Sequence, residues 1–349
     1  MREKGGIRYD QLDLMKLILA IMIMIIHCNR IGTWGVFEVV RFPITRIAVP
    51  LFFIISSFLL FSKLDDGNKG EVLLRFVKNN ALYYVGYFVL LLPITLAYRF
   101  IHSNGTIISF IAALPKSILF GSTFLESWFI SALIIGTLIV YCGERVFKSY
   151  LPLFIIGVAF YMLACMVTNY SSTQLGRIIT DYSKWYPGLL QRSFPVSIVW
   201  ISIGAIFAAN KQNAKERRKS VFLLGLIGIS LLFAEYYLIQ NMGLGNPKEN
   251  DCYFLLLLVC PMIFAFSLSC TMHSKNAIKW RSFSKVSYPL NDSVAGVARI
   301  LFEKIGLYEG TLIINLLITL LQVFGCYVVW KLFYYLKTTK NLKCLKYMV

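Results

Sequence analysis

Apolar residues along this chain come in long blocks, and short polar segments separate the blocks. Each block is about 17–25 residues long, the length that a helix needs to cross a hydrocarbon core. A shorter apolar segment, 106–120, contains Pro115, and we expect it to lie at the membrane interface or to re-enter the bilayer. The pattern predicts an all-α, polytopic integral membrane protein with about ten transmembrane helices, at residues 12–31, 46–62, 79–98, 128–143, 151–168, 189–209, 220–240, 252–272, 287–302 and 311–336.

The composition agrees with a polytopic membrane protein. Of the 349 residues, 58% are hydrophobic and 15% are charged, which is unlike an ordinary soluble domain. The net charge of +18 would suggest a nucleic-acid partner in a soluble protein. Here Lys and Arg lie in short segments between the apolar blocks, such as 211–219 and 275–285. This distribution orients helices in a membrane, so we expect a lipid bilayer and no nucleic acid as partner.

The basic residues also predict that both termini are cytoplasmic. Of the 35 Lys and Arg residues, 22 fall in segments that would then lie inside, namely 1–11, 63–78, 144–150, 210–219, 273–286 and 337–349. An eleventh span at 106–120 would reverse everything after it and place 211–219 outside, so ten spans is the better count. We expect a multi-pass protein of a bacterial plasma membrane, with no appended soluble domain.

The sequence gives no sign of a metal site or a disulfide framework. The eight cysteines contain no C-x-x-C pair, and most lie within apolar blocks, where Cys behaves as a small hydrophobic residue. The three histidines, His27, His102 and His273, are far apart along the chain. We therefore expect no bound metal.

The first predicted helix carries Asp13, Lys16 and His27 in an otherwise apolar stretch. Residues eleven apart on a helix differ by about 20° in direction, so Lys16 and His27 share a face and lie about 16 Å apart. Asp13 lies one turn below Lys16 and can pair with it near the cytoplasmic boundary. Ionisable residues within a membrane usually face the bundle interior and mark functional sites. A hydrogen-bonded structural role also explains a single buried histidine.

Four motifs in the first 141 residues resemble those of the membrane-bound acyltransferase-3 family. They are D-x-x-K followed eleven residues later by His (13–27), RIAVPLFFIISSFLLF (46–61), RFVK (75–78) and SWFISALIIGTLIVY (127–141). Their order, their spacing and the number of spans are similar to the family's ten-helix core. The first two motifs most closely resemble the variant in the membrane portion of vancomycin-resistance serine racemases and in surface-polysaccharide O-acetyltransferases. The resemblance implies one acyltransferase-3-like transmembrane domain over residues 1–349.

Three positions depart from the family pattern. Ser57 stands where the family usually has glycine, which changes helix packing rather than chemistry. Lys78 replaces the second arginine of R-x-x-R, so the charge is kept but the bidentate fork is lost. The stretch 284–297 has no histidine where a late helix of the family often carries one. No functional residue is therefore carried over in the C-terminal part.

The resemblance implies transfer of an acyl group, most simply acetyl, from cytoplasmic acyl-CoA to a hydroxyl of an extracytoplasmic glycan such as a surface or cell-wall polysaccharide. An alcohol is a poor nucleophile, and histidine is the side chain type that best suits proton abstraction at neutral pH. We predict His27 as the general base, with Asp13 and Lys16 completing the catalytic set. Lys16 either contacts the donor or neutralises Asp13.

Other candidate residues fall at the ends of helices. Arg75 and Lys78 are predicted to hold the phosphates of the donor, with anchoring of the helix at the inner surface as the alternative. Arg46 is predicted to position the thioester oxygen or an acidic acceptor, or to anchor its helix by snorkelling. Glu126 and Trp128 are predicted to contact the acceptor.

Two further polar residues and two other functions stay open. Glu235 and Asp292 either face a central cavity or pair two helices. A transporter or flippase of a small polar solute would also place charged residues in a cavity, but inverted repeats and matching broken helices are not evident. A non-catalytic relative is the third interpretation, because a shared fold does not fix function. The acceptor, the acyl chain and the oligomeric state are not predicted.

Overall fold

The computed structural model describes residues 8–28, 37–64, 67–103, 106–124, 127–210, 218–246, 251–306, 312–340 and 342–349. Most of these residues are helical, and none of them forms a strand. The elements used below are α1 (Asp10–Cys28), α2 (Phe37–Thr45), α3 (Ala48–Phe61), α4 (Lys69–Ser103), α5 (Ile107–Phe120), α6 (Trp128–Phe147), α7 (Leu151–Val167), α8 (Gln174–Ser183), η1 (Leu190–Arg192), α9 (Phe194–Ala209), α10 (Arg218–Asn241), α11 (Leu256–Ser269), α12 (Ala277–Lys304) and α13 (Leu312–Thr339).

The predicted all-helical membrane architecture is confirmed. Each of the ten predicted ranges overlaps an α-helix, and the 106–120 segment forms α5, whose 14 residues are too few to span a bilayer. Among the described residues, five helical stretches are long and apolar enough to cross a membrane: Arg41–Phe61, Lys69–Ala97, Trp128–Phe147, Lys219–Asn241 and Ile313–Thr339. Three others, α7, α9 and α11, are apolar but shorter. The count of ten spans and the cytoplasmic location of the termini stay predictions.

Two helices begin well before the apolar blocks that predicted them. α4 begins at Lys69 rather than near residue 79, and α12 begins at Ala277 rather than near residue 287. Hydrophobicity marks only the part of a helix inside the bilayer, whereas polar residues such as Lys, Arg and Glu continue a helix beyond it. Arg75 and Lys78 therefore lie on the first turns of α4, before the apolar block that marks its predicted span.

The predicted 46–62 helix begins two residues later than expected, as α3. Arg46 and Ile47 form a turn between α2 and α3. Pro50 lies in the first turn of α3, where a proline without an N–H group is tolerated. The break takes Arg46 out of the regular helix and places its side chain at the outer end of α3.

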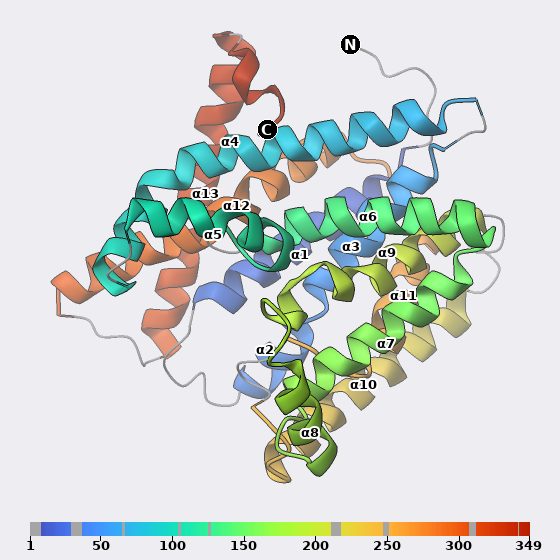
Figure 1. The fold of residues 1–349 in the computed structure, drawn as a ribbon. Coiled ribbons are helices and arrows are strands. Elements are labelled where there is room, and N and C mark those ends of the chain that lie inside the picture. Colours follow the sequence, from blue (N-terminus) through green and yellow to red (C-terminus); the bar gives the residue numbers. More distant parts are fainter. Residues whose placement is uncertain are drawn as a thin grey trace.

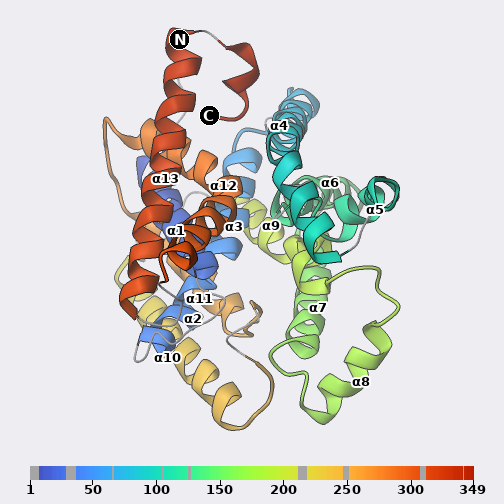
Figure 2. The same ribbon diagram turned by 90° about the vertical axis from the view of Figure 1, so that its left-hand side faces the viewer.

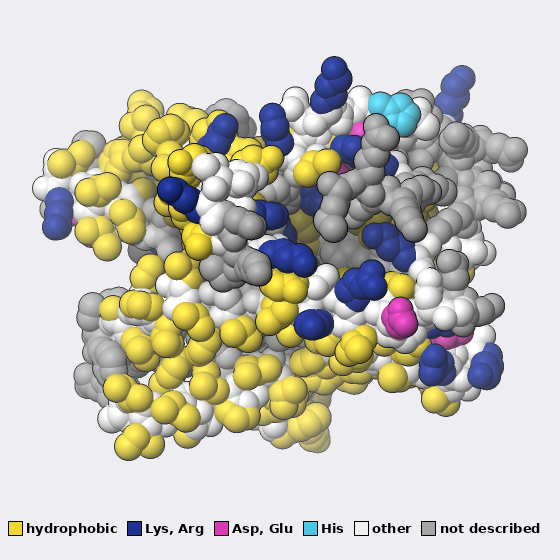
Figure 3. All heavy atoms as spheres, turned by 90° about the horizontal axis from the view of Figure 1, so that it is seen from above, with side chains coloured by type: hydrophobic (Ala, Val, Ile, Leu, Met, Phe, Trp, Pro, Cys, Tyr) yellow, Lys and Arg dark blue, Asp and Glu magenta, His cyan; other side chains and the backbone are white. Residues whose placement is uncertain are grey.

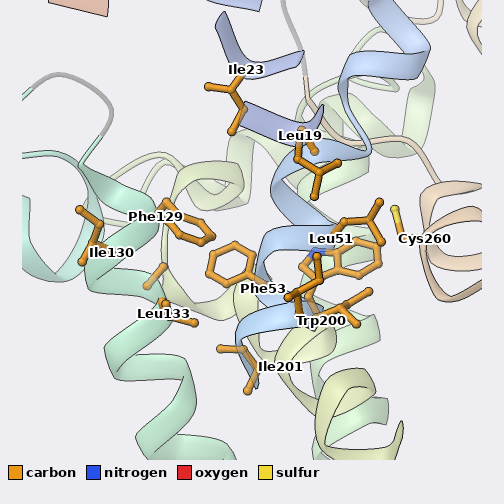
Figure 4. Close-up of a cluster of buried hydrophobic side chains, with 14 of the residues drawn as sticks. Leu19, Ile23, Leu51, Phe53, Phe129, Ile130, Leu133, Trp200, Ile201 and Cys260 are labelled. Carbon is orange, nitrogen blue, oxygen red and sulfur yellow. The ribbon is translucent and has the colours of Figure 1, made fainter. Parts of the chain in front are cut away.

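α9 forms the centre of the hydrophobic core and is buried over most of its length. α3, α6 and α7 pack around it, as expected for a helix that is apolar on every side. Figure 4 shows side chains of this core, with the rings of Phe53 and Phe129 facing each other and Trp200 and Ile201 from α9 beside them. Between the ring centroids of Phe53 and Phe129 the distance is 4.4 Å.

The helices form two groups on either side of α3 and α9 (Figures 1 and 2). α1 packs against α12 and α12 against α13, while α4, α5 and α6 lie on the other side of the core. In Figure 3 hydrophobic side chains cover the left and lower margins of one face, and Lys and Arg side chains gather over its centre and right-hand half. The exposed apolar margin suits contact with lipid.

Candidate functional site

A small cavity lies beside the C-terminal end of α1, which the predicted topology places toward the outside, and we call it the outer cavity. Its volume is about 70 Å³. It brings polar side chains from distant parts of the chain together with an apolar and aromatic wall. The lining residues are Ile23, Ile26, His27, Thr45, Arg46, Val49, Pro50, Phe53, Trp128, Tyr161, Gln191, Arg192, Val196, Trp200, Asp251, Cys252 and Tyr288.

His27 is held at this cavity by capping of the last turn of α1. A helix leaves its final carbonyl groups without partners inside the helix. Arg41 donates from Nη2 to the carbonyl oxygen of Ile26 at 3.2 Å, and Arg299 of α12 donates to the carbonyl oxygen of His27. Cations at a helix C-terminus also interact favourably with the helix dipole. The backbone that carries the imidazole is thus fixed by two arginines.

Asp251 links two arginines at the edge of the outer cavity. Arg46 donates from Nη1 to Oδ1 of Asp251, and Nε of Arg192 lies 3.7 Å from Oδ2. The Arg46 side chain is 7% exposed and that of Asp251 is 30% exposed. Burial alone would raise the pKa of the Asp251 carboxyl, but the nearby positive charges, Arg46 foremost, outweigh it and hold the pKa below its ordinary value. Asp251 is therefore an anion at neutral pH.

The loop that carries Asp251 is fixed by side chains from α7 and the turn after it. Asn169 donates from Nδ2 to the carbonyl oxygen of Cys252 at 2.7 Å, and Tyr161 donates to that of Tyr253 at 2.9 Å. Both side chains are buried. Because a buried backbone carbonyl needs a hydrogen-bond partner, these contacts set the path of the loop at the residues that follow Asp251.

Glu235 of α10 fixes the same loop from the other side. Its carboxylate accepts hydrogen bonds from the backbone N–H of Phe254 at 2.7 Å and of Leu255 at 2.9 Å, and from the Tyr170 hydroxyl at 2.7 Å. These N–H groups precede α11, so the carboxylate caps that helix. Glu235 is 7% exposed. Of the two roles that the sequence left open, it has the structural one, and it joins α10 to the Asp251 loop.

Aromatic rings close the side of the outer cavity that faces the core. Trp128 and Phe53 have ring centroids 6.2 Å apart, and both line the cavity. Phe129 lies behind them, 5.2 Å from the ring of Tyr288. Trp128 therefore lines the same cavity as His27, and its predicted contact with the acceptor stays a prediction. Glu126 lies outside the described residues, and its predicted role also stays a prediction.

Two further cavities lie toward the predicted cytoplasmic ends of α1, α3 and α4. The first, which we call the inner cavity, has a volume of about 330 Å³ and contains the side chains of Lys16, Lys63 and Arg75. The second, the basic cleft, has a volume of about 620 Å³. Its lining contains four cations and one carboxylate: Arg75, Lys78, Lys285, Lys346 and Glu71. Arg75 lines both spaces, so they form one cationic region.

Asp13 belongs to neither the inner nor the outer cavity. Its carboxylate accepts a bidentate pair of hydrogen bonds from Arg281 of α12, at 2.8 Å from Nε and 2.7 Å from Nη2. The predicted pairing of Asp13 with Lys16 in the same helix is wrong. The Asp13 side chain is 1% exposed, and a planar guanidinium matches a carboxylate with two bonds where an ammonium offers one point charge. Asp13 joins α1 to α12.

One face of α3 runs from the outer cavity to the inner cavity. Val49, Pro50 and Phe53 line the outer cavity, and Ser56, Leu59, Leu60 and Lys63 line the inner one. From Phe53 to Ser56 the helix rises only about 4.5 Å. Along α1, Lys16 likewise lines the inner cavity and His27 the outer one. The two spaces thus share two helices and lie close together along α3.

The structure divides the predicted site residues between these places. The outer cavity contains His27, Arg46 and Trp128, and the cationic region contains Lys16, Arg75 and Lys78. Arg46 is thus apart from the other predicted donor-binding residues. The sequence analysis missed most of the other lining residues, among them Arg192, Asp251 and Tyr288. No group of three or more His, Cys, Asp and Glu side chains that could hold a metal ion occurs in the described part of the chain.

A family model described as an acyltransferase domain matches residues 9–290. This chain belongs to the acyltransferase-3 family. The match covers the helices that line the outer cavity, together with Arg75, Lys78 and Lys285 of the basic cleft. The four motifs that resemble this family in the sequence therefore identified it correctly.

Curated relatives of this acyltransferase-3 protein are racemases of enterococci. It is 23% identical to a serine/alanine racemase of Enterococcus gallinarum over 338 residues, which are 93% of this chain and 45% of that protein. It is 29% identical to an amino-acid racemase of Enterococcus faecalis over 261 residues, 71% of this chain and 34% of the relative. The chain thus spans less than half the length of these relatives. No solved structure gives a significant match.

Proposed function

We propose that this protein transfers an acetyl group from cytoplasmic acetyl-CoA to a hydroxyl of a carbohydrate that reaches it from outside the cell membrane. The observation that carries the proposal is the shared wall of α1 and α3, which runs from a cationic region to a cavity that contains His27. A phosphate-bearing donor and a hydroxyl acceptor need these two environments on opposite sides of one reaction centre. Membership of the acyltransferase-3 family supports acyl transfer in general.

Arg75, Lys78, Lys285 and Lys346 are assigned to the phosphates of the donor. Cations at the inner ends of α4 and α12 meet in one cleft with a single carboxylate, Glu71, and charge-assisted hydrogen bonds to phosphate are among the strongest available. The thioester arm then extends through the inner cavity past Lys16 and Lys63 toward Phe53. A helix rise of about 4.5 Å separates the last inner residue from the first outer one on α3.

His27 is assigned the role of general base. It takes the proton of the acceptor hydroxyl while the oxygen attacks the thioester carbonyl carbon, and collapse of the tetrahedral intermediate breaks the carbon–sulfur bond and releases the thiolate of CoA. The proton on His27 then passes to the thiolate. Arg46 is assigned to the oxyanion, because its guanidinium lines the same cavity and Asp251 fixes its position.

The size of the outer cavity supports acetyl rather than a longer acyl chain. A volume of about 10–15 Å³ accommodates one water molecule on the same measure, so the cavity of about 70 Å³ holds roughly five. This is enough for an acetyl group next to the oxygen of a hydroxyl. A sugar ring must therefore stay at the mouth, where Asp251 and Arg192 lie, and present only its hydroxyl.

Labelled acetyl-CoA added to inside-out membrane vesicles tests this assignment. We expect wild-type protein to transfer label to alkali-labile material, and His27→Ala to lower kcat by at least about 100-fold, the usual contribution of a general base. Lys78→Gln with Lys285→Gln should raise KM for acetyl-CoA about tenfold and leave kcat within about twofold, because both residues line the basic cleft and not the inner cavity. The exposed Lys219 and Lys340, replaced by Gln, provide the control pair. Absence of transfer by the wild-type protein to any membrane fraction would refute the proposal.

A second candidate function is passage of an amino acid across the membrane. The relatives are named for serine, alanine and amino-acid racemization, and the outer cavity offers a guanidinium and a carboxylate, Arg46 and Asp251, to a zwitterion. The two candidates differ in a simple observable. The measurement is uptake of labelled serine by cells that carry the protein. Uptake that is lost in Asp251→Asn but kept in His27→Ala would favour transport. Loss of ester transfer in His27→Ala without any effect on uptake favours the acyltransferase.

A further inference from the structure

A lateral groove lies between α1, α12 and α13. Figure 2 shows these three helices on the side of the molecule away from α4 to α6. The volume of the groove is about 530 Å³, within the range of about 300–1,000 Å³ that is common for ligand sites. It shares no lining residue with the outer cavity, the inner cavity or the basic cleft. The described lining has an apolar end and a cationic end.

The apolar end is formed by α1 and α13. Leu17 and Ile21 lie one turn apart on α1, and Leu320 and Phe324 lie one turn apart on α13. Leu320 is 64% exposed and Phe324 is 63% exposed. Both α1 and α13 are predicted to cross the membrane. The apolar end of the groove therefore faces lipid acyl chains rather than water.

The cationic end is formed by Lys279 near the start of α12 and Lys331 in the second half of α13. The ammonium of Lys331 lies 5.6 Å from the ring centroid of Tyr327 and 5.7 Å from that of Trp330, so cation–π contacts hold it at the groove. Trp330 is itself fixed, because its indole N–H donates to the hydroxyl oxygen of Ser282 at 2.9 Å. No acidic side chain belongs to the described lining.

The two ends have the order that a phospholipid of the inner leaflet requires. The predicted topology places the start of α12 and the end of α13 at the cytoplasmic surface, where tryptophan and tyrosine side chains gather in membrane proteins. From Lys331 the chain passes Tyr327, Phe324 and Leu320 at successive turns toward the bilayer centre. A headgroup phosphate at the lysines would thus have its acyl chains along the apolar wall.

We propose that this groove is a binding site for an anionic phospholipid. Its negative headgroup pairs with Lys279 and Lys331, and its acyl chains pack against Leu17, Ile21, Leu320 and Phe324. Charge complementarity selects an anionic over a zwitterionic headgroup, since basic pockets between helices on the cytoplasmic side suit such lipids. The site does not depend on acyl transfer, so it stands or falls separately from the function proposed above.

Native mass spectrometry of the detergent-purified protein, with equal amounts of dioleoyl phosphatidylglycerol and dioleoyl phosphatidylcholine, tests the proposal. The wild-type protein should retain phosphatidylglycerol at least about fivefold over phosphatidylcholine, as expected for two lysines that face one headgroup. Lys279→Gln with Lys331→Gln should abolish this preference. The control pair, Lys219→Gln with Lys340→Gln, removes the same charge from exposed positions outside the groove and should keep it.

A second variant tests the apolar wall. Phe324→Ala should lower retention of both lipids, because it removes a largely exposed ring that the acyl chains cover and disturbs little of the fold. Equal retention of the two lipids by the wild-type protein would overturn the proposal. So would a preference that survives Lys279→Gln with Lys331→Gln, or one that the control pair abolishes to the same degree.

Discussion

Asp251 is the residue on which the outer cavity depends most. It pairs with Arg46 and lies 3.7 Å from Arg192, so it holds two guanidinium groups that would repel each other without it. Glu235 and Asn169 fix the backbone of the loop that carries Asp251. Because the loop is fixed, the Asp251 carboxylate has little freedom to move. A preorganised site requires such fixed side chains.

Replacement of Asp251 by Asn should flatten the dependence of stability on pH. Since the pKa of this carboxyl is lower in the folded protein than its ordinary value of about 3.9, its ion pairs stabilise the fold above that value and are lost as the pH falls through the lowered pKa. At pH 7 the variant should be less stable by roughly 1–3 kcal/mol. The melting temperature of purified protein between pH 2 and pH 7 measures both effects. Parallel curves for the wild-type protein and Asp251→Asn would contradict this account of the loop.

Among the elements, α9 shows how the helices come close enough to form the site. A Cβ atom on Gly204 would overlap the Ser57 hydroxyl and meet the carbonyl oxygen of Ile54 at 2.5 Å. A Cβ atom on Gly157 would meet the backbone of Val199. Small residues let helix backbones approach in membranes, where packing rather than water drives association. Ser57, which stands where the family usually has glycine, is thus accommodated by a glycine on the facing helix.

Gly204→Ala should destabilise the contact between α3 and α9. Overpacking of this kind typically costs about 1–3 kcal/mol. Ser57→Gly should recover part of the loss in the double variant, because it removes the nearest atom. Gly225→Ala provides the control, since a Cβ atom there meets nothing within 4 Å and α10 gains a better helix former. Thermal unfolding followed by size-exclusion chromatography compares them. Equal melting temperatures for Gly204→Ala and Gly225→Ala would show that the helices are not in close contact.

The helices were largely predictable from the sequence, because apolar blocks mark where a helix crosses the membrane. The helix ends were not, since Arg75 and Arg281 lie on polar turns that extend α4 and α12 beyond the hydrocarbon. The pairing of Asp13 with Arg281 was also beyond the sequence pattern. Spacing along one helix favours an intrahelical partner, and only the packing of α1 against α12 brings the better partner close.

For the whole molecule, the arrangement separates a donor side from an acceptor side. Cationic side chains line the inner cavity and the basic cleft, and His27, Arg46 and Asp251 line the outer cavity. His27, Arg46 and Trp128 could be selected from sequence because they lie at motifs near predicted helix ends. Asp251 and Arg192 could not, because each lies at the start of a predicted span, where a solvated charge is the ordinary expectation, and no local signal shows that the two segments meet.

A cytoplasmic donor side and an outer acceptor side require both termini to be cytoplasmic, as the basic residues predict. In a variant with the native cysteines replaced by alanine, Lys184→Cys in the loop after α8 should react with a membrane-impermeant maleimide in intact cells. Lys340→Cys, just after α13, should react only after permeabilisation. Both positions are exposed, so access to the side chain does not distinguish them. The reverse labelling pattern would place the basic cleft outside and exclude a cytoplasmic donor.

The most direct test of the central claim is the amount of alkali-labile acetate on surface glycans. It would be compared between cells that lack the protein and cells that carry equal amounts of inserted wild-type protein, His27→Ala or His273→Ala. His273 is an exposed histidine that lines none of the cavities, so its replacement is the matched control. The account predicts that cells without the protein and cells with His27→Ala lack the same ester, while His273→Ala keeps it. An ester that survives in His27→Ala at the wild-type level would contradict the assignment of His27 as the base.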